Sequence, residues 1–222
     1  MNYEAAIFDL DGTLVNSLDD LADSANATLR AHSFPVHEVE VYRYFVGNGS
    51  RKLIERILPE EYAADMAFVE QFMSEYKDCY AQNLLQKTKP YDGILKMLEE
   101  LRRRGIPMAV CTNKHQSAAE TIVEALFPHD TFWKIIGDQE GLPRKPDPQK
   151  VHRIMKNFGV TGEQTAYFGD TSVDMDTARN AGAFAVGVLW GFRAREELVA
   201  HGADILLTHP MELFEKVTFA EQ

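Results

Sequence analysis

The spacing of hydrophobic positions changes along the chain and divides it into two kinds of segment. The apolar run Ala5 to Phe8 is continuous rather than alternating, which predicts a strand covered by helices on both faces. From about Asn16 to about Gln86 the apolar residues recur at helical spacing, and no strand pattern interrupts them. We therefore expect residues 16–86 to form a small all-helical domain inserted after the first strand.

The helices expected in this insertion are identified by apolar residues that share one face. The first carries Leu18, Leu21, Ala22, Ala25 and Leu29, two shorter ones cover Glu38 to Phe45 and Ser50 to Leu58, and a long one carries Met66, Val69, Met73, Tyr76 and Tyr80.

From Tyr91 onward, strand and helix patterns alternate. The alternation predicts right-handed crossovers and a parallel sheet with helices on both faces. The fold class is thus α/β, with a doubly wound, Rossmann-like core of residues 1–15 and 87–222. The predicted strands are Pro107 to Cys111, Lys134 to Ile136, Ala166 to Phe168, Phe184 to Leu189 and an edge segment at Ile205 to Leu207.

Capping residues predict where three helices begin. Ser17 and Asp20 have the spacing of a capping box, Asp92 can cap the helix that follows it, and Asp147 can cap a helix whose first residue is Pro148.

Composition narrows the classes of partner. The chain has 222 residues, with 23 basic against 34 acidic residues and a net charge of −11, which argues against binding to nucleic acid or an anionic membrane. Cys79 and Cys111 lie in different kinds of element, which argues against a disulfide framework and for a reducing compartment. The longest uncharged run, Ala181 to Phe192, is shorter than the roughly 18–20 residues of a membrane span. We expect a cytoplasmic protein, monomeric or homodimeric.

Candidate chemistry begins where the first strand ends. Asp9 and Asp11 follow it, and Gly12 allows the backbone to turn away. Residues two apart in an extended segment share a face, so both carboxylates would lie at the carboxyl edge of the sheet, where ligands bind. Mg²⁺ is the simplest cation to join them. The alternative is two solvated acids in a turn.

Other polar residues follow later predicted strands, and together they are more specific than any one alone. With Asp9-Leu10-Asp11-Gly12-Thr13, the residues Thr112, Lys145 and Gly169-Asp170 to Asp174 resemble the four motifs of the haloacid dehalogenase superfamily of phosphotransferases. The resemblance spans nearly the whole chain and implies that the strands before Asp9 and Asp170 are neighbours where the sheet order reverses. It also implies that residues 16–86 are a cap domain.

The resemblance implies a role for each acid. Asp9 would be the nucleophile that forms an aspartyl-phosphate and a ligand of Mg²⁺. Asp170 would be a second ligand, and Asp174 a ligand or the group that orients metal-bound waters. Asp11 would contribute its backbone carbonyl to the metal, protonate the leaving alkoxide and then activate the hydrolytic water.

The phosphoryl group would be bound by cations and hydrogen-bond donors. Lys145 would place an ammonium against its oxygens, and Thr112 would donate its hydroxyl, helped by amides near Asn113 at a helix start. Each residue also has an ordinary structural explanation: Thr112 could cap a helix, Lys145 could be solvated, and Asp170 with Asp174 could be acids favoured at a helix N-terminus.

A narrower resemblance concerns the substrate, which we expect to be a small phosphorylated metabolite. Leu14 to Leu18 and Val46 to Ser50 look like the phosphoglycolate phosphatase branch. The turn Gly47-Asn48-Gly49 could present backbone amides to a small anion, and Arg51 could add a charge-assisted contact or be solvated. This fits the carboxylate of 2-phosphoglycolate, which would be hydrolysed to glycolate. The expected substrate-binding residues are Thr13, Gly47, Asn48, Gly49, Arg51 and Asn113.

Other functions share parts of this pattern. Pyrophosphatases, sugar phosphatases and phosphohexomutases resembling β-phosphoglucomutase have the same architecture. A dehalogenase of the superfamily needs neither Mg²⁺ nor an acid at Asp11, so Asp11, Asp170 and Asp174 count against it. A receiver-type signalling module also combines an aspartate phosphoacceptor with Thr and Lys, but the helical insertion and Asp11 disfavour it.

Overall fold

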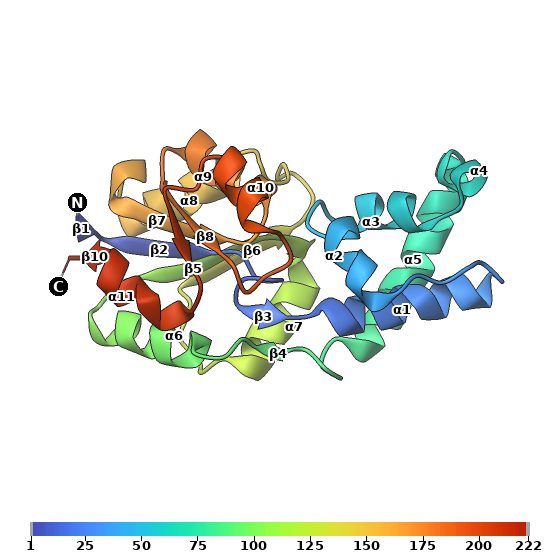
Figure 1. The fold of residues 1–222 in the computed structure, drawn as a ribbon, viewed down its shortest axis with the longest axis horizontal. Coiled ribbons are helices and arrows are strands. Elements are labelled where there is room, and N and C mark those ends of the chain that lie inside the picture. Colours follow the sequence, from blue (N-terminus) through green and yellow to red (C-terminus); the bar gives the residue numbers. More distant parts are fainter. Residues whose placement is uncertain (1, 221–222) are drawn as a thin grey trace.

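A six-stranded parallel sheet forms the larger part of the protein (Figure 1). The structure is a computed structural model, and it describes residues 2–220. The strand order is β6-β5-β2-β7-β8-β9, so successive strands are added first on one side of β2 and then on the other. This confirms the predicted doubly wound α/β fold. The strands are β2 (Ala5–Phe8), β5 (Met108–His115), β6 (Lys134–Asp138), β7 (Thr165–Gly169), β8 (Phe184–Val188) and β9 (Ile205–Leu207).

Helices cover both faces of the sheet, which explains why the first strand is apolar without alternation. Ala6 and Phe8 pack into one hydrophobic cluster, and Ile7 packs into the other. The first cluster includes residues of α6 (Ile94–Arg103), α7 (Gln116–Leu126) and α11 (Leu213–Lys216). The second includes residues of α8 (Gln149–Phe158), α9 (Ser172–Ala181) and α10 (Arg195–Ala200).

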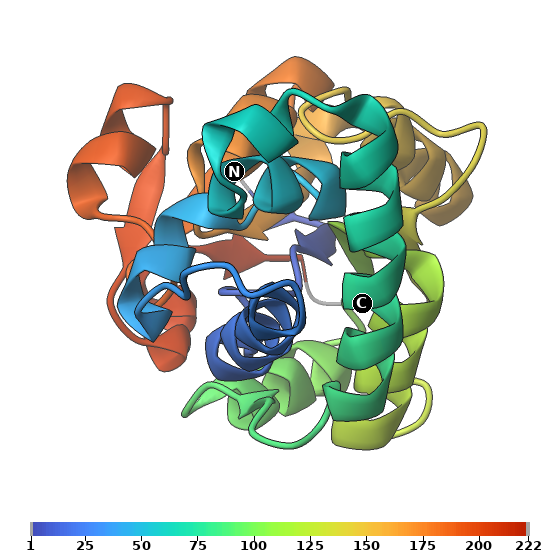
Figure 2. The ribbon, with the colours of Figure 1, turned by 90° about the vertical axis from the view of Figure 1, so that its right-hand side faces the viewer.

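The helices of residues 18–83 form a separate group beyond the carboxyl end of β2 (Figures 1 and 2). We call residues 16–86 the helical insertion; the exact bounds remain a prediction. Its long helices α1 and α5 lie side by side. The elements are α1 (Leu18–Ala31), the 3₁₀ turn η1 (Val39–Val41), α2 (Tyr42–Phe45), α3 (Ser50–Ile57), α4 (Glu60–Ala63) and α5 (Met66–Asn83).

Two chain segments connect the insertion to the sheet, and they pair with each other. Strand β3 (Val15–Asn16) runs antiparallel to β4 (Lys89–Pro90). Asp20 of α1 accepts hydrogen bonds from the backbone amides of Lys87 and Thr88 at 2.8–3.0 Å and from the Thr88 hydroxyl at 2.7 Å. One buried carboxylate therefore joins the entry and the exit of the insertion.

Helix starts differ from the predicted capping. Ser17 is the N-cap of α1, but its hydroxyl donates to Asp11 instead of capping, and Asp20 is engaged by the exit segment. The prediction that Asp92 caps α6 is wrong, because Gly93 with φ of 82° precedes that helix. Asp147 accepts from the backbone amide of Gln149, where α8 begins one residue later than expected.

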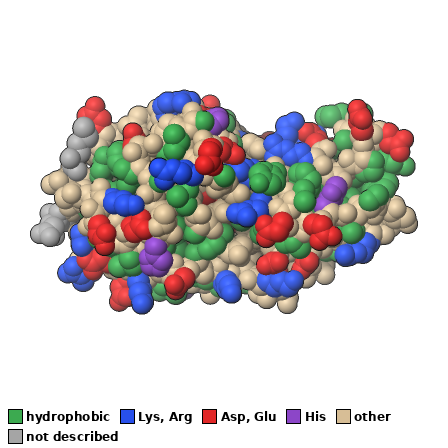
Figure 3. Space-filling view, viewed as in Figure 1, with side chains coloured by type: hydrophobic (Ala, Val, Ile, Leu, Met, Phe, Trp, Pro, Cys, Tyr) green, Lys and Arg blue, Asp and Glu red, His purple; other side chains and the backbone are tan. Residues whose placement is uncertain are grey.

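The remaining elements lie at the edges of the fold. Strand β1 (Asn2–Tyr3) pairs in parallel with β10 (Thr218–Phe219), and the 3₁₀ turns are η2 (Gly162–Gln164) and η3 (Pro210–Glu212). On the face of the molecule drawn in the space-filling view, acidic and basic side chains are interspersed and not segregated (Figure 3). None of the helices in residues 2–220 has both the length and the apolar run required to cross a membrane.

Candidate active site

The carboxyl ends of three neighbouring strands bring the predicted motifs together. Phe8 at the end of β2 is paired with Val110 of β5 and Phe168 of β7, so Asp9 emerges between the two adjacent strands. Asp170 follows β7 directly. Ligand oxygens of Asp9, Asp170 and Asp174 lie within 4.8 Å of one another, and all three residues are buried. The expectation that the strands bearing Asp9 and Asp170 are neighbours is confirmed.

Lys145 is a cation paired with two acids of this cluster, Asp9 and Asp174. Its side chain is 1% exposed, and its Nζ lies 2.9 Å from Asp9 Oδ1 and 2.7 Å from Asp174 Oδ1. Burial alone would lower the pKa of the Lys145 ammonium, but the carboxylates of Asp174 and Asp9 outweigh it and raise the pKa above its usual value. Lys145 is therefore a permanent positive charge beside Asp9, not a solvated lysine.

The three carboxylates still carry more negative charge than Lys145 offsets. Burial raises the pKa of Asp9 to about 6, with Lys145 opposing the shift and Asp174 adding to it. Burial, then Asp174 and Asp9, raise the pKa of Asp170 well above its usual value. Asp9 Oδ1 is buried and accepts no well-aligned hydrogen bond from residues 2–220, although Lys145 lies close to it. Buried oxygen ligands with this charge fit a hard divalent cation such as Mg²⁺.

Backbone and hydroxyl donors fix the orientation of Asp170 and Asp174. Asp170 accepts from the Thr13 hydroxyl at 3.0 Å and from the Phe192 amide at 2.8 Å. Asp174 forms a capping box with Thr171, whose hydroxyl donates to it at 2.6 Å. Asp174 is thus an acid that caps the start of a helix, which is the ordinary structural explanation given above for this residue. It also contacts Lys145.

Gly12 allows the loop after β2 to approach the cluster closely. Its φ is +84°, and a Cβ placed there would lie 2.2 Å from Asp170 Oδ2. Any other residue would be strained in its backbone and would push Asp170 out of place. The sequence predicted the turn at Gly12, and the structure adds the close approach to Asp170.

Asp11 lies apart from the three clustered acids, on the side facing the insertion. The Ser17 hydroxyl donates to its Oδ1 at 2.6 Å, and Lys114 Nζ donates to both carboxylate oxygens at 3.0 Å. The hydroxyl of Tyr80, from α5 of the insertion, also accepts from Lys114 at 2.6 Å. Asp11 is therefore held in one orientation by residues of both parts of the protein.

Thr112 and Asn113 belong to β5, which continues to His115 rather than ending at Cys111. Asn113 accepts from the Lys145 amide at 2.9 Å and donates to the Lys145 carbonyl at 3.2 Å and the Gly47 carbonyl at 3.3 Å. It therefore connects the lysine motif to the insertion. The Thr112 carbonyl accepts from Lys150, a fully buried lysine of α8, at 3.1 Å.

A cavity of about 430 Å³ opens beside Asp9 and Asp11 between the sheet and the insertion. Leu21, Leu53, Tyr76 and Leu84 form its apolar wall on the insertion side. Of the predicted site residues, the cavity is lined by Asp9, Asp11, Gly47, Gly49, Thr112 and Asn113.

Three predicted substrate-binding residues do not line this cavity. Thr13 is buried, and its hydroxyl donates a hydrogen bond to Asp170. Asn48 accepts from the guanidinium of Arg56 at 2.9 Å, and Arg51 forms an ion pair with Glu70 of α5. The other terminal nitrogen of the Arg51 guanidinium, Nη1, is buried and has no hydrogen-bond partner among residues 2–220.

Lys114 and Tyr80 line the cavity but were not predicted from the sequence. A signal for Lys114 was present, because Thr112 and Lys114 are two residues apart on a strand and therefore share a face. Tyr80 was predicted only as part of the apolar stripe of α5, and nothing in the helical spacing marks its hydroxyl as a partner of Lys114.

Known proteins resemble this chain over most of its length. A family model of haloacid dehalogenase-like hydrolases matches residues 6–188. A Mesorhizobium japonicum protein named phosphoglycolate phosphatase is 32% identical, over 88% of this chain and 86% of its own. A Pseudomonas aeruginosa protein named N-acetylmuramic acid 6-phosphate phosphatase is 28% identical, over 97% of this chain and 95% of its own. A solved structure from Lactobacillus delbrueckii subsp. bulgaricus, described as a candidate phosphoglycolate phosphatase, superimposes with a TM-score of 0.91 at 31% identity, covering 98% of this chain and 99% of that one.

Proposed function

We propose that this chain, which belongs to the haloacid dehalogenase-like hydrolase family, is a Mg²⁺-dependent phosphatase that acts through an aspartyl-phosphate on Asp9. The single observation that carries the proposal is the cluster of Asp9, Asp170 and Asp174, in which Lys145 pairs with Asp9 and Asp174. Phosphatase activity is the activity of the family members it resembles, and this chain is a phosphoric monoester hydrolase of that kind.

Asp9 is placed to act as the nucleophile. A phosphate monoester repels a carboxylate, so attack by an Asp9 oxygen on phosphorus requires cations that reduce the repulsion. Lys145, 2.9 Å from Asp9, supplies one positive charge. Mg²⁺ held by Asp9 and Asp170, with Asp174 beside them, would supply the rest and neutralise charge on the transferring phosphoryl group. Thr112 and the amides near Asn113 would bind its remaining oxygens.

Asp11 is placed to transfer protons. In the first step it would protonate the alkoxide that leaves as the phosphoryl group moves to Asp9, and in the second its carboxylate would take a proton from the water that hydrolyses the aspartyl-phosphate. Its separation from the metal-binding acids supports this division of labour. Asp11 contacts Ser17 and Lys114.

The substrate we propose is 2-phosphoglycolate, hydrolysed to glycolate. The Mesorhizobium japonicum relative carries that substrate in its name, and Gly47, Gly49 and Ser50 line the cavity at the start of α3. A sugar phosphate is the second candidate, because a cavity of about 430 Å³ falls within the roughly 300–1,000 Å³ of sites that hold much larger ligands.

A panel of phosphate esters assayed with Mg²⁺ and with chelator tests these proposals. We expect multiple-turnover phosphate release that stops on chelation and is absent from Asp9→Asn, with 2-phosphoglycolate preferred over sugar phosphates and pyrophosphate. Turnover that persists with chelator would refute the metal assignment, and turnover by Asp9→Asn would refute the nucleophile. Conversion between sugar phosphates without phosphate release would indicate a mutase, and a stable phosphoprotein would indicate a receiver module.

A further inference from the structure

Lys114 is a nearly buried lysine whose hydrogen-bonding capacity is already used. Its side chain is 4% exposed. Two of its contacts are to the two carboxylate oxygens of Asp11, each at 3.0 Å, and the third is to the Tyr80 hydroxyl at 2.6 Å. An ammonium group has three N–H donors and no acceptor. Lys114 therefore lines the cavity with all three donors engaged, which suits it to hold a neighbour and not to bind a substrate.

The contacts of Lys114 join three separate segments of the chain. Asp11 lies in the loop after β2, Lys114 lies near the end of β5, and Tyr80 lies in the last turns of α5 in the insertion. The ammonium also lies over the Tyr80 ring, 4.6 Å from its centroid, which adds a cation–π attraction. Tyr80 is itself buried and stacked on Tyr76. The position of Lys114 therefore depends on the seating of the insertion over the sheet.

We propose that Lys114 is the positioning residue for proton transfer by Asp11, and that Tyr80 makes this positioning dependent on the seating of the insertion. The inference rests on the proposed function, in which Asp11 protonates the leaving group and then activates water. Two parallel contacts from one ammonium fix the plane of the Asp11 carboxylate, and Ser17 binds the same group at 2.6 Å. Proton transfer requires such alignment, because its efficiency depends on hydrogen-bond geometry at the reacting atoms.

Loss of this positioning should leave a specific kinetic signature. Transfer of the phosphoryl group from p-nitrophenyl phosphate to Asp9 needs little protonation of the leaving group, because p-nitrophenolate is a stable anion. An alkyl phosphate such as 2-phosphoglycolate needs a proton on its leaving oxygen. Hydrolysis of the aspartyl-phosphate needs a base in both cases. A misaligned Asp11 should therefore permit one round of p-nitrophenol release and then block hydrolysis of the aspartyl-phosphate.

The experiment compares Lys114→Met, Lys114→Gln and Tyr80→Phe with the unmodified protein and with Asp11→Asn, all with Mg²⁺. For both Lys114 variants we expect steady-state turnover of 2-phosphoglycolate to fall by about 10²-fold, the lower end of what general acid–base catalysis contributes. With p-nitrophenyl phosphate we expect a rapid burst of close to one p-nitrophenol per enzyme, followed by slow turnover. Tyr80→Phe, which keeps the ring, should show the same pattern more weakly.

Matched controls separate this effect from general damage. Lys216→Met removes a lysine of α11 that is bonded to Glu212, and Tyr62→Phe removes a tyrosine hydroxyl from α4 at the far end of the insertion. Both should keep the unmodified rates. Thermal unfolding of every variant, followed by circular dichroism, shows which are folded. Lys114→Gln, which retains a neutral donor, and Tyr80→Phe test the inference if Lys114→Met does not fold.

Three outcomes would overturn the inference. Folded Lys114 variants with unchanged turnover of 2-phosphoglycolate would make the residue dispensable. Loss of the p-nitrophenol burst together with turnover would mean that Lys114 acts on phosphoryl transfer itself. A loss seen with 2-phosphoglycolate but not with 2-hydroxyethyl phosphate, which has a hydroxyl in place of the carboxylate, would make Lys114 a ligand of the substrate carboxylate. Two other results would refute the proposed function itself: no phosphate release by the unmodified protein, or turnover by Asp11→Asn equal to that of the unmodified protein.

Discussion

Lys145 and Lys150 are buried lysines five positions apart whose surroundings act on them in opposite directions. Lys145 lies between Asp9 and Asp174, and those carboxylates raise its pKa despite burial. Burial lowers the pKa of Lys150, whose ammonium donates to the carbonyl of Thr112. The same residue type is thus held charged at the centre of the site and made less basic just behind it.

Replacing Lys145 by Met should remove one electrostatic stabiliser of the transferring phosphoryl group. A comparable preorganised donor contributes about 2.7–4 kcal/mol to a transition state, or about 10²–10³ in rate. We expect kcat on the preferred phosphate ester to fall by that factor. Lys156→Met, on the exposed face of helix α8, which begins four residues after Lys145, should not change it. A change below a few-fold in Lys145→Met would exclude Lys145 from the reaction.

The two cysteines should differ sharply in reactivity. Cys111 is fully buried, and burial raises the pKa of its thiol to about 11, although Lys145 and Lys150 oppose the shift. Because the reactive species is the thiolate, a raised pKa leaves Cys111 almost entirely protonated and inert at pH 8. Cys79 is partly exposed on α5. Titration with a thiol reagent at pH 8 should find about one reactive thiol in the folded protein and two in denaturant. Two rapid equivalents in the folded protein would contradict this burial of Cys111.

At the scale of single elements, periodicity predicted most of the fold, because strands and helices bury faces with different repeats. The continuous run at Ala5–Phe8 and the helical stripes were sufficient to place the sheet strands and most of the helices. Element ends were harder to predict. The polar residues there have tertiary partners that a local pattern does not contain: Ser17 donates to Asp11 rather than capping α1, and Asp20 binds the exit of the insertion.

In the candidate site, too, residues placed by a local pattern could be predicted, and contacts with a distant segment could not. Asp9, Asp11 and Asp170 could be placed from the sequence, because parallel strands end at a common edge and the acids follow strand patterns directly. The Tyr80 contact with Lys114 could not, since it depends on how the insertion sits over the sheet. Arg51 was expected beside the substrate on the basis of its helix start, but Glu70 from another helix pairs with it.

Asp20→Ala should destabilise the connection between the insertion and the sheet. The carboxylate is 2% exposed and accepts from the amides of Lys87 and Thr88. Removing it leaves the buried amide of Thr88 without an acceptor, which costs about 1–3 kcal/mol. We expect the free energy of unfolding in urea to fall by about that amount. Asp19→Ala, on the neighbouring position of the same helix turn, is the control and should stay within about 0.5 kcal/mol.

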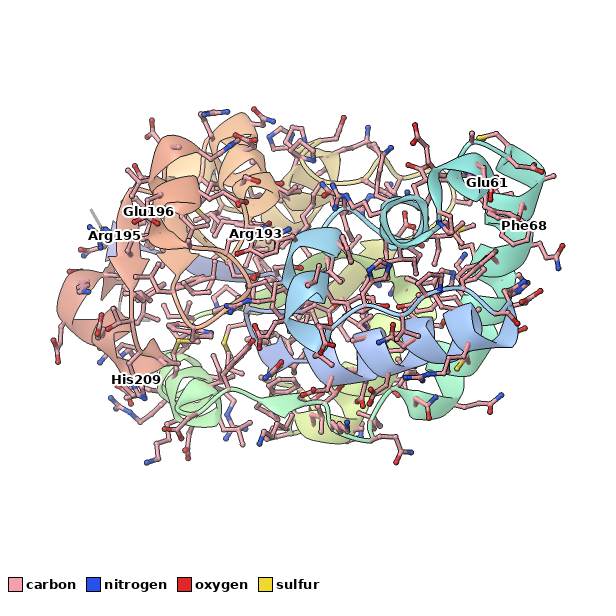
Figure 4. The ribbon with its side chains drawn as sticks, turned by 45° about the vertical axis from the view of Figure 1, so that its right-hand side comes forward. Glu61, Phe68, Arg193, Arg195, Glu196 and His209 are labelled. Atoms are coloured by element: carbon pink, nitrogen blue, oxygen red, sulfur yellow. The ribbon has the colours of Figure 1, made fainter. Side chains whose placement is uncertain are left out.

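At the scale of the whole molecule, the insertion and the sheet exchange contacts next to the cluster of Asp9, Asp170 and Asp174. Arg43 of α2 donates to the carbonyls of Gly191 at 2.8 Å and Phe192 at 3.2 Å. In return, Arg193, labelled in Figure 4, donates to the carbonyl of Val46 at 3.0 Å. The amide of Phe192 binds Asp170. The loop that orients Asp170 is therefore the same loop that anchors the insertion.

Mg²⁺ should stabilise the folded protein as a whole. Binding to the folded state at a tenfold excess over Kd contributes about 1.4 kcal/mol, which corresponds to an increase in Tm of roughly 3–6 °C for a protein of this size. We expect this shift in thermal unfolding, its reversal by chelator, and a much smaller shift in Asp170→Asn. An equal shift in Asp170→Asn would place the bound Mg²⁺ elsewhere.

The position of β2 in the middle of the sheet has a consequence for how the protein is made. This strand leaves the ribosome long before one of its two neighbours, β7, is translated: the bond from Thr13 to Asp170 spans 157 positions. At about 5–20 residues per second, synthesis of that span takes on the order of ten seconds or longer. During that interval the edge of the nascent β2 that pairs with β7 has no partner, whereas the helical insertion has already been synthesised. The nascent chain should therefore be a client of ribosome-associated chaperones until β7 emerges, and its release from them should coincide with completion of the acidic cluster.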